Sequence, residues 1–146
     1  MTRKITYLFA FLLCSLNGFA TVYYNIANSN SLNSTTQWGT NTDGSGTRPS
    51  NFTTSGDVFN IYNGTTTRLS GTWTLASGVT INVGDGTSAI TFEQNDQNIT
   101  TTCTINVRAN ARFLIEDVTV GQLSTLAATS TVEYGSTEGH IIQAGT

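Results

Sequence analysis

Four aromatic residues offer the most evident binding chemistry in this sequence. Tyr23 and Tyr24 are adjacent near the N-terminus, Trp38 follows in a glycine-rich stretch, and Trp73 lies further along the chain. An aromatic ring can pack on the apolar face of a sugar while Asn and Thr side chains bind its hydroxyl groups. The four residues are therefore candidates for a carbohydrate-binding surface. Large aromatic rings are more often buried, so closing the end of a hydrophobic core is the alternative role for Trp38 and Trp73.

Residues suited to catalysis are sparse. The single histidine, His140, has no serine or cysteine nucleophile motif near it, and the G-x-S-x-G, H-E-x-x-H and C-x-x-C patterns are missing from the sequence. Glycoside hydrolysis requires two carboxylates that face each other across a groove. Glu116 and Asp117 are adjacent, and neighbours on a strand point to opposite faces. We therefore expect a protein without enzymatic activity, catalytic residues or a cofactor.

Two loops contain oxygen ligands of the kind that calcium prefers. Residues 41–45 read Asn-Thr-Asp-Gly-Ser, but Phe52 occupies the position at which an EF-hand places its bidentate glutamate. Residues 84–86 read Gly-Asp-Gly, without the nonapeptide recurrence of calcium-binding β-helix repeats. A turn stabilised by its own aspartate explains both segments. The sequence therefore predicts no metal site.

The elements that must position these residues are short β-strands. Apolar residues recur at every second position, and turn-forming pairs such as Asn63-Gly64 and Ser77-Gly78 separate the segments. No segment has a persuasive helical period. The alternating apolar residues are Phe59, Ile61, Trp73, Leu75, Val79, Ile81, Val83, Ile90, Phe92, Cys103, Ile105, Val107, Phe113, Ile115, Val118, Val120, Val132 and Tyr134.

An internal repeat indicates how the strands are arranged. Residues 79–83 read Val-Thr-Ile-Asn-Val, and residues 103–107 read Cys-Thr-Ile-Asn-Val. Residues 130–134 have the same alternation and are interpreted as the third copy. Recurrence at this spacing is typical of a solenoid, in which each coil stacks on the one before it. We predict an all-β fold, a parallel β-helix (β-solenoid) of short coils with a loop-rich N-terminal cap. Ile81 should lie directly beneath Ile105.

The N-terminus has the features of an export signal. Arg3 and Lys4 precede an apolar core at residues 5–13, and Gly18-Phe19-Ala20 places small residues where a signal peptidase cleaves. The apolar run is too short to span a bilayer. We therefore expect residues 1–20 to be removed and the mature protein to be secreted or on the cell surface.

Removal of this signal would leave four arginines against nine carboxylates, a formal net charge of −5. Nucleic acids and anionic membranes bind clustered Lys and Arg, so neither is an expected partner. No membrane span is expected after cleavage. Cys103 would be the one remaining cysteine, which excludes a disulfide within the mature chain.

About 125 residues would remain, enough for one domain. We expect the N-terminal cap at residues 21–56 and solenoid coils at 57–146 that continue beyond the chain end. No capping segment is evident after the last coil, and an open strand edge invites pairing. The isolated chain is therefore expected to self-associate through this C-terminal coil, around Val132, Tyr134 and Ile141.

The glycine- and asparagine-rich segment that begins at Trp38 resembles the start of secreted Bacteroidetes-type surface proteins. It reads Trp-Gly-Thr-Asn-Thr-Asp-Gly-Ser-Gly at residues 38–46 and, after Pro49 and Asn51-Phe52, Gly-Asp-Val-Phe-Asn-Ile at 56–61. The Val-Glu-Tyr-Gly run at residues 132–135 is similar to coil ends in such proteins. Those proteins carry a β-solenoid, often followed by further repeats and a sorting domain of the type IX secretion system. The resemblance implies export and a parallel β-helix, and it identifies no ligand.

Together these features predict a non-catalytic structural or adhesin-like surface module, a stalk or ligand-presenting β-solenoid of a secreted protein. The alternative is a carbohydrate-binding or remnant segment of a polysaccharide-active β-helix protein. The expected partner in either case is a surface polysaccharide or another cell-surface protein.

Overall fold

The computed structural model describes residues 20–100, 103–116, 122–135 and 140–142. The expected export signal therefore lies outside the described residues except for Ala20, as do Asp117, Val118 and Val120. Within the described residues, no helix is long and apolar enough to cross a membrane.

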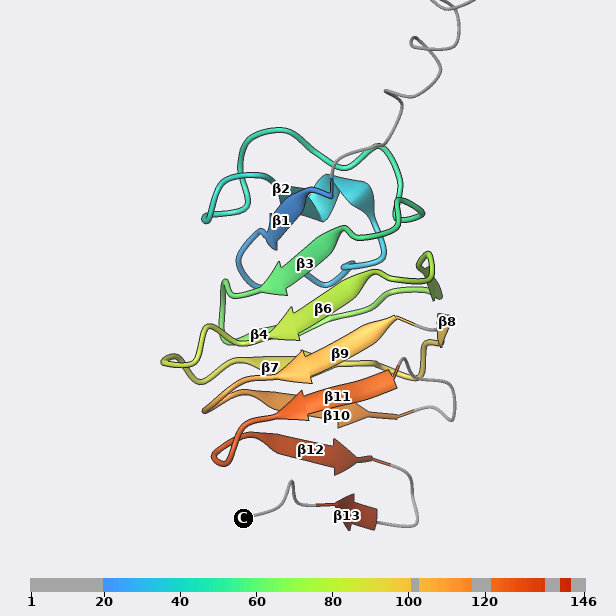
Figure 1. The fold of residues 1–146 in the computed structure, drawn as a ribbon. Helices are drawn as coiled ribbons and strands as arrows, with labels where there is room; N and C mark the ends of the chain where they lie inside the picture. The colour runs from blue at the N-terminus through green and yellow to red at the C-terminus, as the bar shows by residue number, and fades with distance from the viewer. Residues whose placement is uncertain (1–19, 101–102, 117–121, 136–139, 143–146) are drawn as a thin grey trace, which may run out of the picture.

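Short parallel strands stack into a β-solenoid, which confirms the expected fold class (Figure 1). The front sheet contains, in spatial order, β11 (Gln122–Leu126), β9 (Thr104–Val107), β6 (Thr80–Val83), β3 (Val58–Ile61), β1 (Val22–Asn25) and β2 (Trp38–Gly39). The back sheet contains β13 (His140–Ile142), β12 (Thr131–Tyr134), β10 (Arg112–Ile115), β7 (Thr91–Glu93) and β4 (Thr66–Arg68). A small third sheet pairs β5 (Trp73–Thr74) with β8 (Ile99–Thr100), and one short 3-10 helix, η1, spans Thr35–Gln37.

The front sheet keeps equivalent residues of successive coils in register. Ile81 on β6 pairs with Ile105 on β9, as the repeat predicts, and on its other side with Phe59 on β3. Side chains of a strand alternate between its two faces, so this register places one apolar column inside the solenoid. The neighbouring polar column is thereby directed outward.

The interpretation of residues 130–134 as the third copy of the repeat is wrong. The strand at these residues, β12, pairs with β10 of the back sheet, and β11 is the strand that follows β9 in the front sheet. The reason is a shorter coil. Asn106 is bonded across the sheet to Asn82, 24 residues earlier, but to Thr125 only 19 residues later. Residues 131–134 therefore lie in the back sheet, and not in the front sheet as the repeat suggested.

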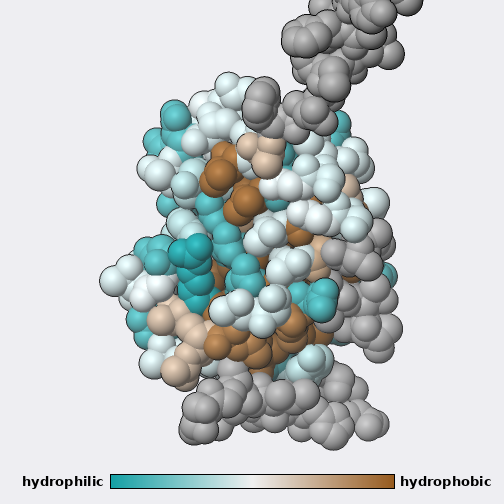
Figure 2. All heavy atoms as spheres, in the orientation of Figure 1, coloured by the Kyte–Doolittle hydropathy of each residue, from teal (hydrophilic) through white to brown (hydrophobic). Residues whose placement is uncertain are grey.

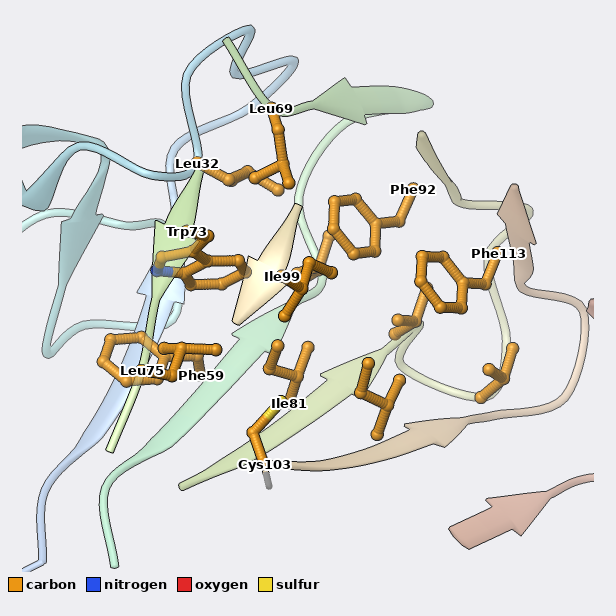
Figure 3. Close-up of a cluster of buried hydrophobic side chains, with 14 of the residues drawn as sticks. Leu32, Phe59, Leu69, Trp73, Leu75, Ile81, Phe92, Ile99, Cys103 and Phe113 are labelled. Carbon is orange, nitrogen blue, oxygen red and sulfur yellow. The ribbon is translucent and has the colours of Figure 1, made fainter. Parts of the chain in front are cut away.

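The core is a continuous column of aliphatic and aromatic side chains. Phe92 and Phe113 stack on each other with ring centroids 4.9 Å apart, Trp73 meets Phe92 at 6.4 Å, and Phe59 packs against Trp73 at 5.9 Å (Figure 3). Cys103 is fully buried in this column, and burial raises the pKa of its thiol to about 11. The thiolate is the reactive form of cysteine, so we expect the native thiol to be unreactive.

Asn25, at the end of β1, fastens the N-terminal segment to the first coil. Its side chain is completely buried, and its Oδ1 accepts hydrogen bonds from the backbone N–H groups of Tyr62 and Asn63 at 2.8 and 3.0 Å. Its Nδ2 donates to the carbonyl of Asn63 at 2.8 Å. Buried amides without partners are costly, so this side chain satisfies a turn that would otherwise have open backbone groups.

At the C-terminal end, the sequence predicted an unpaired strand edge and an exposed side chain at Val132, and the structure shows neither at this residue. This side chain is only 1% exposed, because β12 turns its apolar residue into the same core as Phe113 of β10. The other edge of β12 pairs antiparallel with β13. Within the described residues, β11 is the last strand of the front sheet at this end. Self-association through the C-terminal coil stays a prediction, with β11 as the strand edge concerned.

Candidate binding face of the front sheet

The two tryptophans proposed for sugar binding lie in the core. Trp38 and Trp73 are both completely buried, and their rings stack at 5.4 Å between centroids. The indole N–H of Trp38 donates to the carbonyl of Leu32 at 2.8 Å. Figure 3 shows Trp73 beside Phe59 and Leu75. Both rings therefore take the packing role that large aromatics usually have.

The two tyrosines lie at the edge of this cluster. Tyr23 is 8% exposed and stacks on Phe59, with centroids 5.3 Å apart. Tyr24 points to the opposite face of β1, where it is half-buried and meets the edge of Tyr62 at 5.7 Å. Of the four aromatic residues, Tyr24 is thus the one whose ring lies on the outer face of the front sheet. The structure does not bring the four together on one surface.

A row of three asparagines occupies this outer face. Asn60, Asn82 and Asn106 hold the same register on β3, β6 and β9, and we call them the asparagine row. Nδ2 of Asn82 donates to Oδ1 of Asn60 at 2.8 Å, and Nδ2 of Asn106 donates to Oδ1 of Asn82 at 2.9 Å. An amide carries both donor and acceptor, so identical residues on stacked strands can form a chain.

The asparagine row is enclosed at both ends. Tyr24 pairs with Asn60 in the register of β1 and β3. At the other end the backbone N–H of Thr125 donates to Oδ1 of Asn106 at 3.2 Å, where the strand pairing of β11 shifts register. Asn60 and Asn82 are only 5% and 7% exposed, whereas Asn106 is half-buried. Access to the row is therefore greatest at its C-terminal end.

A second column lies beside the row, at the residues that follow β3, β6 and β9. The backbone N–H of Gly84 donates to the carbonyl of Ile61, and that of Arg108 to the carbonyl of Val83, so the ladder continues through Tyr62, Gly84 and Arg108. Gly84 has no side chain to separate its neighbours. The guanidinium carbon of Arg108 lies 5.2 Å from the centre of the Tyr62 ring, within the range of a cation–π interaction.

Electrostatics at Tyr62 reflect this arrangement. Burial raises the pKa of the Tyr62 hydroxyl above its usual value, and the positive charge of Arg108 acts in the opposite direction. The phenol therefore remains neutral and polar at physiological pH. A neutral phenol can both donate and accept a hydrogen bond at the edge of the face.

Asn82 and Asn106 of the row and Arg108 of the second column line a pocket of about 240 Å³, which we call the asparagine groove. Among the described residues that line it, Arg108 alone is charged, and its side chain is exposed. Figure 2 shows this side of the molecule, where hydrophilic side chains run across the front sheet beside hydrophobic ones. The lining residues are Asn82, Asn106, Val107, Arg108, Ala109, Thr125 and Ala127.

The acidic residues considered for metal binding or catalysis lie elsewhere. Asp43 accepts hydrogen bonds from the backbone and hydroxyl of Ser45, and Asp85 accepts from Thr87 and Ser88. These bonds lower the pKa of both carboxyl groups. Both loops are thus aspartate-stabilised turns. No group of three or more His, Cys, Asp and Glu residues suited to a metal ion occurs within the described residues.

The other two acidic positions considered are incompletely described. The carboxylate of Glu116 accepts a hydrogen bond from the backbone N–H of Asn95 at 2.5 Å. Asp117 and the side chain of His140 lie outside what the structure describes. The described contact of Glu116 is thus a structural one, between adjacent coils.

Sequence reasoning missed the residues of this face. The repeated Thr-Ile-Asn-Val string already carries an asparagine at the same position in two copies, and Phe59-Asn60-Ile61 repeats that alternation. The asparagine row could therefore have been found from the register. The approach of Arg108 to Tyr62 has no comparable signal, because the two residues are 46 positions apart and lie in no repeated string. Comparisons of the chain with protein-family models, curated proteins and solved structures found no match.

Proposed function

We propose that this chain is a non-catalytic structural or adhesin-like module of a secreted or cell-surface protein. Its solenoid would serve as a rigid stalk and as a scaffold that presents the outer face of the front sheet. The observation that carries this proposal is the asparagine row, a chain of in-register amides on the outer side of an apolar core that is most accessible at Asn106. Stacked coils of this kind create the extended surfaces that solenoid proteins use for binding.

The carboxylates support a non-catalytic role. A glycosidase needs one carboxyl group that is free to protonate a leaving group and a second that faces it. Six carboxylates of the described residues instead accept bonds within turns, between coils or in ion pairs. They are Asp43, Asp57, Asp85, Glu93, Glu116 and Glu133.

Incubation of the purified chain with neutral and acidic polysaccharides tests this function. We expect retention of the protein on an immobilised polysaccharide or on intact cells, without release of reducing ends or unsaturated products. Product release that is abolished by Glu116→Gln would contradict the proposal and establish an enzyme. Mass spectrometry of the exported protein should find Thr21 at the N-terminus, and an intact N-terminus would contradict the proposed export route.

A carbohydrate-binding role is the second candidate, and the asparagine groove favours it. Amide groups, a hydroxyl and a guanidinium converge there with two small apolar side chains, Ala109 and Ala127. Sugar recognition uses this combination of apolar contact and directed hydrogen bonds. Binding of oligosaccharides to the chain, without their cleavage, is the expected result.

A further inference from the structure

Arg108 differs from the two arginines of the back sheet. Arg68 and Arg112 form ion pairs with Glu93 and Glu133 at 3.2 and 2.6 Å. Arg108 contacts the ring of Tyr62, and within the described residues no carboxylate lies at ion-pair distance from it. A guanidinium carries five N–H donors in a planar fork that matches a carboxylate. The Arg108 guanidinium is thus positioned by the Tyr62 ring, while its N–H groups remain available to bind a carboxylate.

The asparagine row keeps hydrogen-bonding capacity after its internal bonds are made. A side-chain amide has two N–H donors and an oxygen that accepts two bonds. Asn106 uses one donor toward Asn82 and accepts one bond from the backbone of Thr125. The hydroxyl of Thr125 lies on the same lining and is exposed. These groups are suited to the paired donor and acceptor character of sugar hydroxyls.

We propose that the asparagine groove binds a carboxylate-bearing sugar residue of an acidic polysaccharide. The carboxylate lies on Arg108, the ring hydroxyls bond Asn106 and Thr125, and Ala109 and Ala127 contact the apolar face of the sugar. This inference rests on the proposed binding role and specifies its ligand class. The pocket, at about 240 Å³, is smaller than the roughly 300–1,000 Å³ of drug-sized sites, which suits one sugar residue of a longer chain.

Charge selects this ligand over a neutral one. The groove presents one cation and otherwise uncharged polar groups, so a ligand with one negative charge per residue satisfies it. A neutral sugar would leave the guanidinium without a counter-charge. Binding should therefore weaken as the salt concentration rises, because the guanidinium is exposed.

The test is a titration of the full chain with oligogalacturonate and with the same oligomer after methyl esterification of its carboxylates. We expect wild type to bind the acid and to bind the ester at least tenfold more weakly. Arg108→Gln should weaken binding of the acid about 10- to 100-fold, the range for a charge-assisted hydrogen bond. Thr125→Glu, which adds a negative charge at the groove, should have a similar effect. Arg48→Gln, a matched change of an exposed arginine that does not line the groove, should leave binding unchanged.

Three results would overturn the inference. Equal binding of the acid and the ester would show that charge is not recognised, and equal binding by Arg108→Gln and wild type would place the site elsewhere. Neither would contradict a surface module that binds neutral sugars. Absence of binding to both oligomers would also overturn the inference. Retention of the protein on cells would in that case still support the proposed function. Unchanged circular dichroism and melting temperature of Arg108→Gln exclude misfolding as the cause of lost binding.

Discussion

On the outer faces of the front and back sheets, side chains of successive coils lie close together, and the two faces accommodate this with different residues. On the front sheet identical asparagines stand above one another and bond along the row. On the back sheet the corresponding surface carries opposite charges, in the pairs Arg68–Glu93 and Arg112–Glu133. Parallel in-register strands place equivalent residues about 4.8 Å apart, a distance at which like charges repel. An uncharged amide avoids this repulsion, and because it both donates and accepts it can bond to its own copy in the next coil.

The two faces also differ in how firmly they are held. Asn60 and Asn82 are nearly buried, so the loss of a partner leaves a desolvated polar group. The back-sheet ion pairs are partly exposed, with Arg68 42% and Arg112 37% accessible. Exposed ion pairs contribute little to stability. The difference indicates that the outer face of the front sheet is held by nearly buried hydrogen bonds, whereas that of the back sheet is held by partly solvated ion pairs.

Asn82→Ala should produce the largest loss of stability. It removes the partner of the nearly buried Asn60 and of the half-buried Asn106, and an unsatisfied buried group costs about 1–3 kcal/mol. We expect a decrease of about 2–4 kcal/mol in the free energy of unfolding, measured by urea denaturation. The matched change on the outer face of the back sheet, Glu93→Ala, should cost about 0.2–1 kcal/mol. Equal losses for the two variants would mean that the faces do not differ as described.

Gly84→Ala tests the second column of the front face. Gly84 has φ +87°, and a Cβ atom there would lie 2.5 Å from Cβ of Ala111. The left-handed conformation alone costs an alanine about 1–2 kcal/mol. Gly86→Ala is the matched control, because residue 86 has φ +92° and no atom within 4 Å of its Cβ position. Gly84→Ala should lower the melting temperature more than Gly86→Ala does, and the reverse order would contradict this packing.

Glu133→Gln should have a smaller effect that depends on salt. It removes the charge that accepts from Nε of Arg112 at 2.8 Å and from its terminal nitrogen at 2.6 Å. We expect a loss of about 0.5 kcal/mol at low ionic strength. The loss should shrink at about 1 M salt, where the screening length is about 3 Å. A loss that persists at high salt would show that the pair is buried more deeply than described.

Asp85→Asn should have the smallest effect, and it should appear only above acidic pH. Hydrogen bonds from Thr87 and Ser88 lower the pKa of Asp85 in the folded state. Because the pKa is lower in the folded than in the unfolded state, where it is about 4, the ionised carboxylate stabilises the folded state above pH 4. This stabilisation is lost as the pH falls through the pKa of the folded state. The melting temperatures of wild type and variant should therefore differ at neutral pH and converge as the pH falls through the lowered folded-state pKa. A difference that grows with acidity would contradict this sign.

The fold could be predicted from the sequence because alternation and repetition both recur over many residues. Ile81 and Ile105 are in register as predicted. The position of residues 130–134 could not be predicted from the sequence. The coil length changes from 24 to 19 residues, and the change falls in the loops, where no residue pattern indicates the coil length. For Trp38 and Trp73 the sequence left two roles open, sugar binding and packing in the core, and the structure shows both rings buried in the core. The contact of Arg108 with Tyr62 depends on three coils at once and could be seen only in space.

Nuclear Overhauser measurements on the isotope-labelled chain test the parallel, in-register asparagine face most directly. Contacts are expected between the side-chain amide protons of Asn82 and those of Asn60 and Asn106, together with contacts between the methyl groups of Ile81 and Ile105. The amide protons of Asn82 should also exchange slowly with solvent, because they are buried and bonded. Cross-strand α-proton contacts of an antiparallel pair between β6 and β9, or missing contacts among the three amides, would contradict the account.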